Sequence, residues 1–262
     1  MSETSTALAV LTRNNFLAIA DDSEMRRALE ANMLEGDTFS EGSLIRVKTP
    51  SAGALKWTIN GISGPEEVTE IEGAMVFQCK RGVLWRSLDP TPGSKPVLST
   101  SDLKLARMVC DKRDVPKDML AQIENCVVKL AEKEGESDIY DWAALPYTQY
   151  GSGRNGQGKF AKEQRVLFVL RKTDAWPLMI NVQPGSLRAI TNFIMQLPVP
   201  FWRAVIGLSL KTSKSGAGID YSEIVPRLKG ILSEEDGQLL YSRYTAGLKA
   251  SYEAGKLHVD EE

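Results

Sequence analysis

The chain has 262 residues, of which 42% are hydrophobic, so it can bury a substantial core and is not disordered as a whole. Its 32 Lys and Arg face 34 Asp and Glu, and the net charge of −2 excludes a protein that is basic over its whole surface. His258 is the only histidine, and the usual phosphate-loop, dinucleotide, zinc-protease and serine-hydrolase motifs are missing. We therefore expect a protein that is not an enzyme, with no catalytic residue and no cofactor.

Three cysteines, Cys79, Cys110 and Cys126, are widely spaced and odd in number, which is typical of reduced thiols in a cytoplasmic protein. No run approaches the ~18–20 apolar residues that cross a bilayer. The first residues are acidic and lack the basic start of a secretion signal. These features predict a cytoplasmic protein without membrane contact.

In the first half of the chain, residues 21–36 are predicted to form a short helix after an N-terminal arm. Four strands follow from β-rich runs between Gly, Pro and Ser, at residues 43–49, 54–59, 68–79 and 82–86. The "KRG" of residues 80–82 is predicted to be a hairpin turn. Residues 89–102 contain three prolines and predict a loop, and residues 117–135 predict an amphipathic helix that ends at Gly135.

In the second half, "QRVLFVLRK" and "WPLMINVQ" predict buried strands, and Pro184 begins a predicted helix with one apolar stripe. A strand in "FWRAVIGLSLKTSKSG" is expected to lead into a basic loop. Ser233 is the predicted N-cap of a last helix, with Asp236 at its third position. We predict an α+β protein around an OB-like Greek-key β-barrel with inserted and appended helices. The expected divisions are 1–36, 37–232 with an insertion at about 89–165, and 233–262.

Positive charge gathers in residues 141–232, which hold twelve Lys and Arg against five Asp and Glu. Such a block suits an anionic partner, and a solvated basic face explains it equally well.

Within this block, residues 141–165 form a loop rich in glycine, cations and aromatic residues. Its glycine amides, with Ser152 and Asn155, could contact phosphates. The candidate phosphate contacts are Arg154, Lys159, Lys162 and Arg165, and the candidate base-stacking residues are Tyr147, Tyr150 and Phe160. The alternative is a solvent-exposed hairpin loop that its aromatic residues anchor to the rest of the fold.

Weaker candidates lie outside this loop. Trp57 and Trp85 could stack on bases from the barrel face, although such aromatic residues are more often core, and Lys80 and Arg81 could contact the backbone. Lys211 and Lys214 are predicted to lie in a loop that suits phosphate, and a plain solvated loop would look the same.

The order of motifs over roughly 190 residues resembles a family of single-stranded-DNA-binding proteins of phages and prophages. The matching stretches read "TING", "GVLWR", "PVLSTSD", "WAALPYTQYGS", "GQGKFAKEQR", "LFVLR", "PGSLRAI", "GIDYSEI" and "LSEED". In that family a zinc knuckle is held by four cysteines, whose positions here are occupied by Leu98, Trp142, Leu145 and Ala161. Because zinc needs Cys or His ligands, we expect no metal, and we expect these four side chains to pack together as an apolar plug.

The resemblance and the basic loop together predict a non-sequence-specific single-stranded-DNA-binding protein of phage or mobile-element replication or recombination. The alternative is a protein-binding adaptor or inhibitor module of phage origin. The acidic end, residues 260–262, would recruit replication or recombination proteins, or is an ordinary polar terminus. The sequence leaves open DNA versus RNA preference, homo-oligomerisation and site size.

Overall fold

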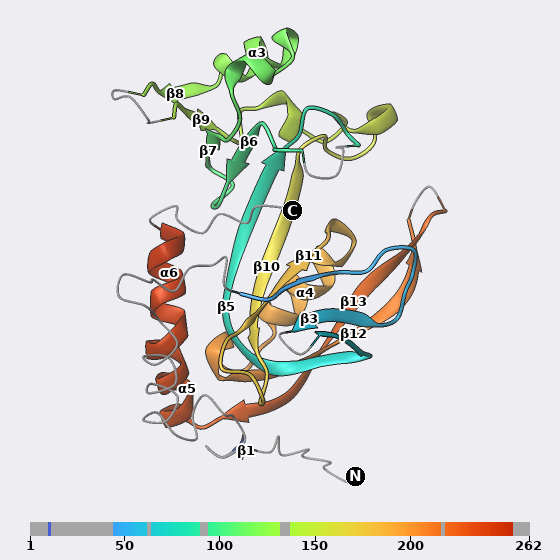
Figure 1. Ribbon diagram of the computed structural model, residues 1–262, viewed down its shortest axis with the longest axis vertical. Helices are drawn as coiled ribbons and strands as arrows, with labels where there is room; N and C mark the ends of the chain where they lie inside the picture. Colours follow the sequence, from blue (N-terminus) through green and yellow to red (C-terminus); the bar gives the residue numbers. More distant parts are fainter. Residues whose placement is uncertain are drawn as a thin grey trace. The chain divides into compact units, whose positions relative to one another are not determined.

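The computed structural model describes residues 10–11, 44–61, 64–89, 94–131, 137–215 and 218–253. The helix predicted at 21–36 and the C-terminal tail lie outside the described residues. The chain divides into two compact units, the first made of Met1–Gln78 and Val166–Lys256 and the second of Cys79–Arg165 and Leu257–Glu262. The chain passes from the first unit to the second within β5 (Glu70–Leu84) and returns within β10 (Lys162–Leu170) (Figure 1).

The first unit is built from strands that surround one long helix of the chain's second half. Its strands besides β5 and β10 are β1 (Val10–Leu11), β2 (Arg46–Lys48), β3 (Trp57–Gly61), β4 (Gly64–Val68), β11 (Leu178–Val182), β12 (Ala204–Lys214) and β13 (Asp220–Leu232). The helix α4 (Pro184–Met195) begins at the predicted Pro184. Pairing runs β1–β13–β12–β5 and β2–β11–β10–β5, and β3 and β4 form a separate hairpin.

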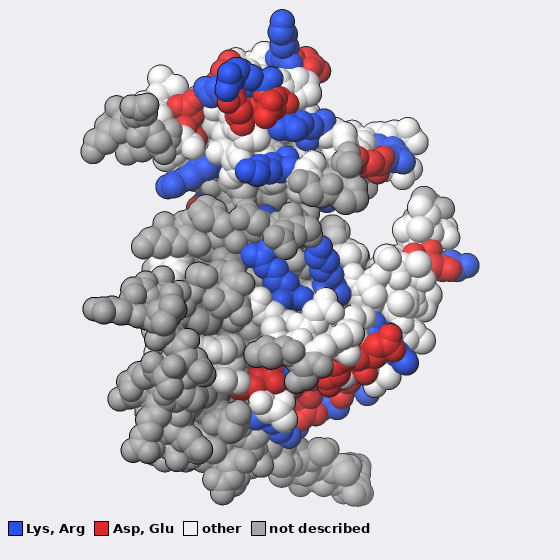
Figure 2. All heavy atoms as spheres, viewed as in Figure 1, with Lys and Arg blue, Asp and Glu red and all other residues white. Residues whose placement is uncertain are grey.

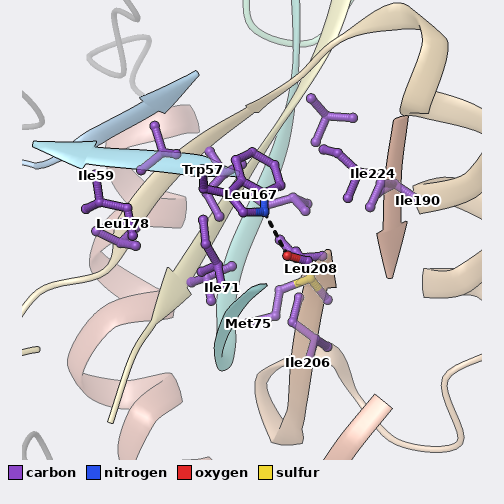
Figure 3. Close-up of a cluster of buried hydrophobic side chains, with 14 of the residues drawn as sticks. Trp57, Ile59, Ile71, Met75, Leu167, Leu178, Ile190, Ile206, Leu208 and Ile224 are labelled. Carbon is purple, nitrogen blue, oxygen red and sulfur yellow. Dashed lines mark hydrogen bonds between the residues drawn. The ribbon is translucent and has the colours of Figure 1, made fainter. Parts of the chain in front are cut away.

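The core of the first unit lies between α4 and the inner faces of these strands. Trp57, Ile71 and Met75 are fully buried there with Leu167 and Ile180 (Figure 3). The indole N–H of Trp57 donates a hydrogen bond to the carbonyl of Leu208 at 2.9 Å. The apolar stripe predicted on α4 packs against this core, so that prediction is confirmed.

The last helix follows the predicted cap, because the Ser233 hydroxyl accepts a hydrogen bond from the Asp236 amide at 3.1 Å. α5 (Glu234–Leu240) continues through a π-helical turn, Tyr241–Thr245, into α6 (Ala246–Glu253). The Tyr244 hydroxyl donates to the Ala175 carbonyl at 2.6 Å, and the rings of Tyr252 and Phe77 lie 6.0 Å apart. These contacts fix the helix on the sheet of the first unit.

The second unit contains the end of β5, then β6 (Leu98–Thr100), β7 (Leu105–Met108), α3 (Lys117–Glu124), β8 (Val127–Lys129) and β9 (Ile139–Asp141). Its strands pair in the order β5–β6–β7–β9–β8. Short 3₁₀ turns at Lys112–Asp114, Pro146–Thr148 and Arg154–Gly156 complete it. Met119 and Ile123 of α3 are buried in its core.

Taken over the described residues, the fold is α+β, with a large and mostly antiparallel sheet and few helices. The pairs β1–β13 and β11–β2 are parallel, and the order of the described strands does not close into a ring. The α+β class is therefore confirmed. Among the described residues, no helix is long and apolar enough to cross a membrane.

Several predicted elements are wrong. The predicted loop of residues 89–102 contains the strand β6 (Leu98–Thr100). Residues 80–82 are no hairpin turn, because β5 runs unbroken through them and pairs with β6 rather than folding back. Gly82 instead makes room for the Trp142 ring, because a Cβ at this position would stand only 2.4 Å from that ring. The helix predicted to reach Gly135 ends at Glu124. The β-branched residues Val127 and Val128 that follow belong to β8, which pairs with β9.

Candidate nucleic-acid interface

The loop that joins β9 to β10 in the second unit carries the strongest predicted site, and its base is anchored in the core. Tyr147 and Phe160 pack against that core and against each other, with ring centroids 5.3 Å apart. The Ala161 amide donates to the Tyr147 carbonyl at 2.9 Å. Burial raises the pKa of Tyr147. These two rings therefore anchor the loop, as the alternative interpretation expected.

Hydrogen bonds inside the loop use the donors that were predicted to meet phosphate. The Gly151 and Gly153 amides both donate to the Gly158 carbonyl, at 2.7 and 3.2 Å. The Ser152 hydroxyl lies 2.9 Å from the Tyr147 carbonyl and accepts from the Phe160 amide at 2.9 Å. The prediction that these groups face a ligand is wrong, because they close the loop on itself and hold its shape.

Tyr150 differs from the other aromatic residues of the loop, since 83% of its surface is exposed. Arg154 and Lys159 are exposed on the same loop. Arg154 pairs with Asp89, and the Lys159 ammonium lies 2.7 Å from the Glu163 carboxylate. Exposed ion pairs of this kind contribute ~0–1 kcal/mol, so an incoming phosphate can compete for either cation.

Two further cations stand where the loop enters β10. Lys162 is half-buried and has no ion-pair partner within the part of the chain that is described. Burial lowers the pKa of the half-buried Arg165, which still carries its charge at neutral pH. The loop and the start of β10 thus carry one exposed aromatic ring, Tyr150, and four cations, Arg154, Lys159, Lys162 and Arg165.

The predicted tryptophan platforms are wrong. Trp57 is 0% exposed and Trp85 is 4% exposed, so neither ring offers a face to a base. Arg81 is buried within β5, which removes it from the surface, and Lys80 is exposed beside it. Both tryptophans are core residues, as the alternative prediction for them stated.

Lys211 and Lys214 do not lie in a loop, because β12 extends to Lys214. Lys211 pairs with Glu223 at 3.2 Å, and the hydroxyl of Ser213 and the Lys211 cation hold the pKa of Glu223 below its usual range. These residues and Trp57 belong to the first unit, and the remaining candidates belong to the second.

In Figure 2, Lys and Arg side chains over α3 and the strands near it lie among Asp and Glu, and in the middle of the drawn face a few Lys and Arg side chains lie apart from acidic ones. Arg86 and Lys112, for example, pair with Asp114 and Asp138 at 3.5 and 2.7 Å. An anionic strand would therefore be attracted by local groups of cations and not by a broad basic field.

The four residues that were predicted to form an apolar plug come together in the second unit. Leu98, Trp142, Leu145 and Ala161 are all buried in the same hydrophobic cluster. The expected apolar plug is thus confirmed. Across the described ranges, no three His, Cys, Asp or Glu residues are placed so that they could hold a metal ion.

A pocket in the first unit was missed by the sequence analysis. It has a volume of about 420 Å³ and is lined by Gln183, Gly185, Ser215, Ile219 and Tyr221. In the sequence, its one indication is Ile219, a single apolar residue in the polar turn between β12 and β13. No family model, curated protein or solved structure matches the chain.

Proposed function

We propose that the chain binds single-stranded DNA without sequence preference and without chemistry, through the loop that carries Tyr150. The observation that carries the proposal is the 83% exposure of Tyr150 on a loop that its own hydrogen bonds keep rigid. A large ring held out in water gains free energy when an unpaired base stacks on it, by about 1–3 kcal/mol per base.

The cations of the loop supply the second half of the interaction. Arg154, Lys159 and Lys162 follow Tyr150 within twelve residues, on the same loop and at the start of β10, and in this proposal they bind phosphates that flank the stacked base. Stacking on an aromatic face tolerates any base, and phosphate contacts carry no sequence information. This combination supports non-specific binding of a single strand.

The OB-like barrel is part of the proposal in its finer form. A barrel of that kind offers a strand face beside such a loop, and single-strand-binding proteins commonly use it. The loop mechanism does not depend on closure of the sheet. The proposed role in phage or mobile-element replication or recombination, in the cytoplasm of the host, rests on the ordered motifs "WAALPYTQYGS" to "LSEED".

The second candidate function is protein binding, as an adaptor or inhibitor. It is favoured by exposed apolar side chains on the second unit, namely Leu105, Val128 and Leu130. Val128 belongs to β8, which stands at the end of the strand order and therefore has an unpaired edge among the described strands. Edge strands of this kind accept a strand from another chain.

Replacing Tyr150 by Ala tests the first candidate. We expect the affinity for a single-stranded oligonucleotide, measured by fluorescence anisotropy, to fall by roughly 5- to 100-fold, because one stacked base is lost. Leu130→Ala is the matched control, since it removes a large apolar side chain that is 66% exposed in the same unit. Equal affinities for both variants and the wild type would remove the loop from the binding site.

A further inference from the structure

Arg165, near the start of β10, is a half-buried cation whose charge is not compensated within the described part of the chain. Among the described residues it takes part in no ion pair and no hydrogen bond. Burial of the guanidinium lowers the pKa of Arg165, and no carboxylate acts in the opposite direction. Moving a charge partly out of water costs free energy unless a partner offsets the loss, so a group of this kind requires an explanation.

The other arginines show that this lack of a partner is unusual in the molecule. Arg171 follows β10 directly and is half-buried like Arg165, but its guanidinium donates to Asp174 at 2.7 Å and to Glu66 at 2.8 Å. Among the described residues, every other buried or half-buried arginine also has a partner; these are Arg46, Arg81, Arg203 and Arg243. Arg165 is therefore the exception in a chain that otherwise pairs the arginines it buries.

The acidic residue closest to Arg165 in the sequence is already engaged. Side chains alternate along a strand, so Glu163 lies on the same face of β10 as Arg165. The Glu163 carboxylate lies 2.7 Å from the Lys159 ammonium and makes no ion pair with Arg165. An anion from outside the described residues would supply the missing partner.

A second uncompensated cation lies on the opposite face of the same strand. Lys162 is half-buried, whereas the other described lysines are exposed, and it too has no partner among the described residues. Because three residues separate Lys162 from Arg165, alternation places them on opposite faces, and each would take an anion of its own. Two separate anions fit the repeated phosphates of a nucleic acid strand, whose oxygens a guanidinium binds in bidentate fashion.

We infer that Arg165 binds a phosphate group, and that this phosphate belongs to the backbone of the bound DNA strand. The inference rests on the single-strand binding proposed above and adds a contact on β10 to the Tyr150 loop. Because an uncompensated half-buried charge destabilises the free protein, removing the charge should stabilise the fold, and so should binding of a phosphate.

The test compares Arg165→Met with the matched control Arg171→Met. Both changes replace a half-buried guanidinium by a long apolar side chain, but Arg171→Met leaves the carboxylates of Asp174 and Glu66 without this partner. Melting temperatures are recorded in chloride and in inorganic phosphate of equal ionic strength. Anisotropy titrations with oligothymidylate of about 20 nucleotides, at several salt concentrations, give the affinity and the salt slope.

We expect Arg165→Met to melt roughly 2–4 °C above the wild type in chloride, and Arg171→Met to melt below it. Inorganic phosphate should raise the melting temperatures of the wild type and of Arg171→Met more than that of Arg165→Met. Arg165→Met should bind oligothymidylate roughly ten-fold or more weakly, with a log–log salt slope flatter by ~0.7, whereas Arg171→Met should bind like the wild type.

The inference would be overturned if Arg165→Met melted below the wild type, or if it bound oligothymidylate as tightly as the wild type does. Either result would leave the proposed function intact as long as the wild type binds the single strand. A wild type that binds no oligothymidylate would overturn the proposed function and the DNA strand as the source of the phosphate. A stabilisation by inorganic phosphate that still depended on Arg165 would then assign the site to a free phosphate, and its absence would remove the site as well.

Discussion

Three aromatic residues of one loop differ in burial, although their sequence surroundings are similar. Tyr147 and Phe160 are packed into the second unit, and Tyr150 between them is exposed. All three stand in the same polar, glycine-rich stretch, so no local pattern separates them. Tyr147 and Phe160 pack against a core formed by residues far away in the sequence, such as Leu98 and Ile123. The sequence around the loop does not reveal those contacts.

Removing the cations of the loop is the first prediction at this scale. The triple change Arg154→Ala, Lys159→Ala and Lys162→Ala should flatten the log–log salt dependence of single-strand binding by about two units, at ~0.7 per lost phosphate contact. Stability should change little, because the two ion pairs involved are exposed. The slope is measured by anisotropy titrations at several salt concentrations.

The matched control replaces Lys104, Arg107 and Lys117 by Ala. These residues are exposed in the same unit and have the same types and total charge. Their loss should leave the slope close to that of the wild type. A control triple that flattens the slope as much as the loop triple would show that binding depends on overall charge and not on the loop.

At the scale of elements, the apolar plug shows how a knuckle-like region can hold together by burial. The Trp142 ring comes so close to Gly82 that a Cβ added there would stand 2.4 Å from it, and Leu98, Leu145 and Ala161 belong to the same cluster as Trp142. A fully buried large side chain contributes ~1.5–3 kcal/mol, so the three large residues of the plug stabilise this region without a metal ligand among them. The plug was predictable from the sequence because it needs only four apolar residues at motif positions.

Trp142→Ala should lower the free energy of unfolding by ~3–5 kcal/mol, because it empties the centre of this plug. Trp142→Phe should cost less, since the indole N–H is buried and has no acceptor among the described residues. Denaturant unfolding followed by circular dichroism measures both. If the two variants were equally unstable, the indole N–H would have to be satisfied in the folded protein.

The C-terminal helix gives a prediction about alkaline stability. Burial raises the pKa of Tyr244 from 10.0 to about 12, so the ring stays neutral in the folded chain after it would ionise in the unfolded one. The stabilisation is complete below pH 10 and is lost as the pH rises to 12, on the order of 2–3 kcal/mol.

Tyr244→Phe should therefore lose some stability at pH 7, where it lacks the hydrogen bond to the Ala175 carbonyl, and should fall less steeply than the wild type between pH 10 and 12. Unfolding curves recorded along this pH range compare the two proteins. Parallel pH profiles would mean that the hydroxyl ionises in the folded state as it does in water.

Elements with strong local signals were predictable, and elements decided by distant contacts were not. The apolar runs of β10 and β11, Pro184 at the start of α4 and the Ser233 cap each carry their signal within a few residues. By contrast, the composition of "KRG" is typical of a turn, but these residues continue the strand β5. Gly82 is present there because the Trp142 ring leaves no room for a Cβ. The apolar residues at the end of the predicted 117–135 helix have helical spacing, but Val127 to Lys129 form the strand β8 because they pair with β9.

On the scale of the whole molecule, the two units offer different kinds of candidate contact. The second unit carries an exposed ring and cations on a loop that is closed by its own hydrogen bonds, and the first carries a pocket lined by neutral residues. The net charge of −2 means that neither contact is helped by the charge of the molecule as a whole. Binding must therefore depend on these local groups and weaken as salt screens them.

The most direct test of the central claim is an anisotropy titration of the wild type with single-stranded and double-stranded oligonucleotides at two salt concentrations. About four to six neutralised phosphates predict micromolar or tighter binding of the single strand, with a log–log salt slope near −3 to −4. Duplex binding should be weaker, because paired bases are not free to stack on Tyr150. A salt-independent response, or equal affinity for the duplex, would contradict single-strand binding and favour a protein partner.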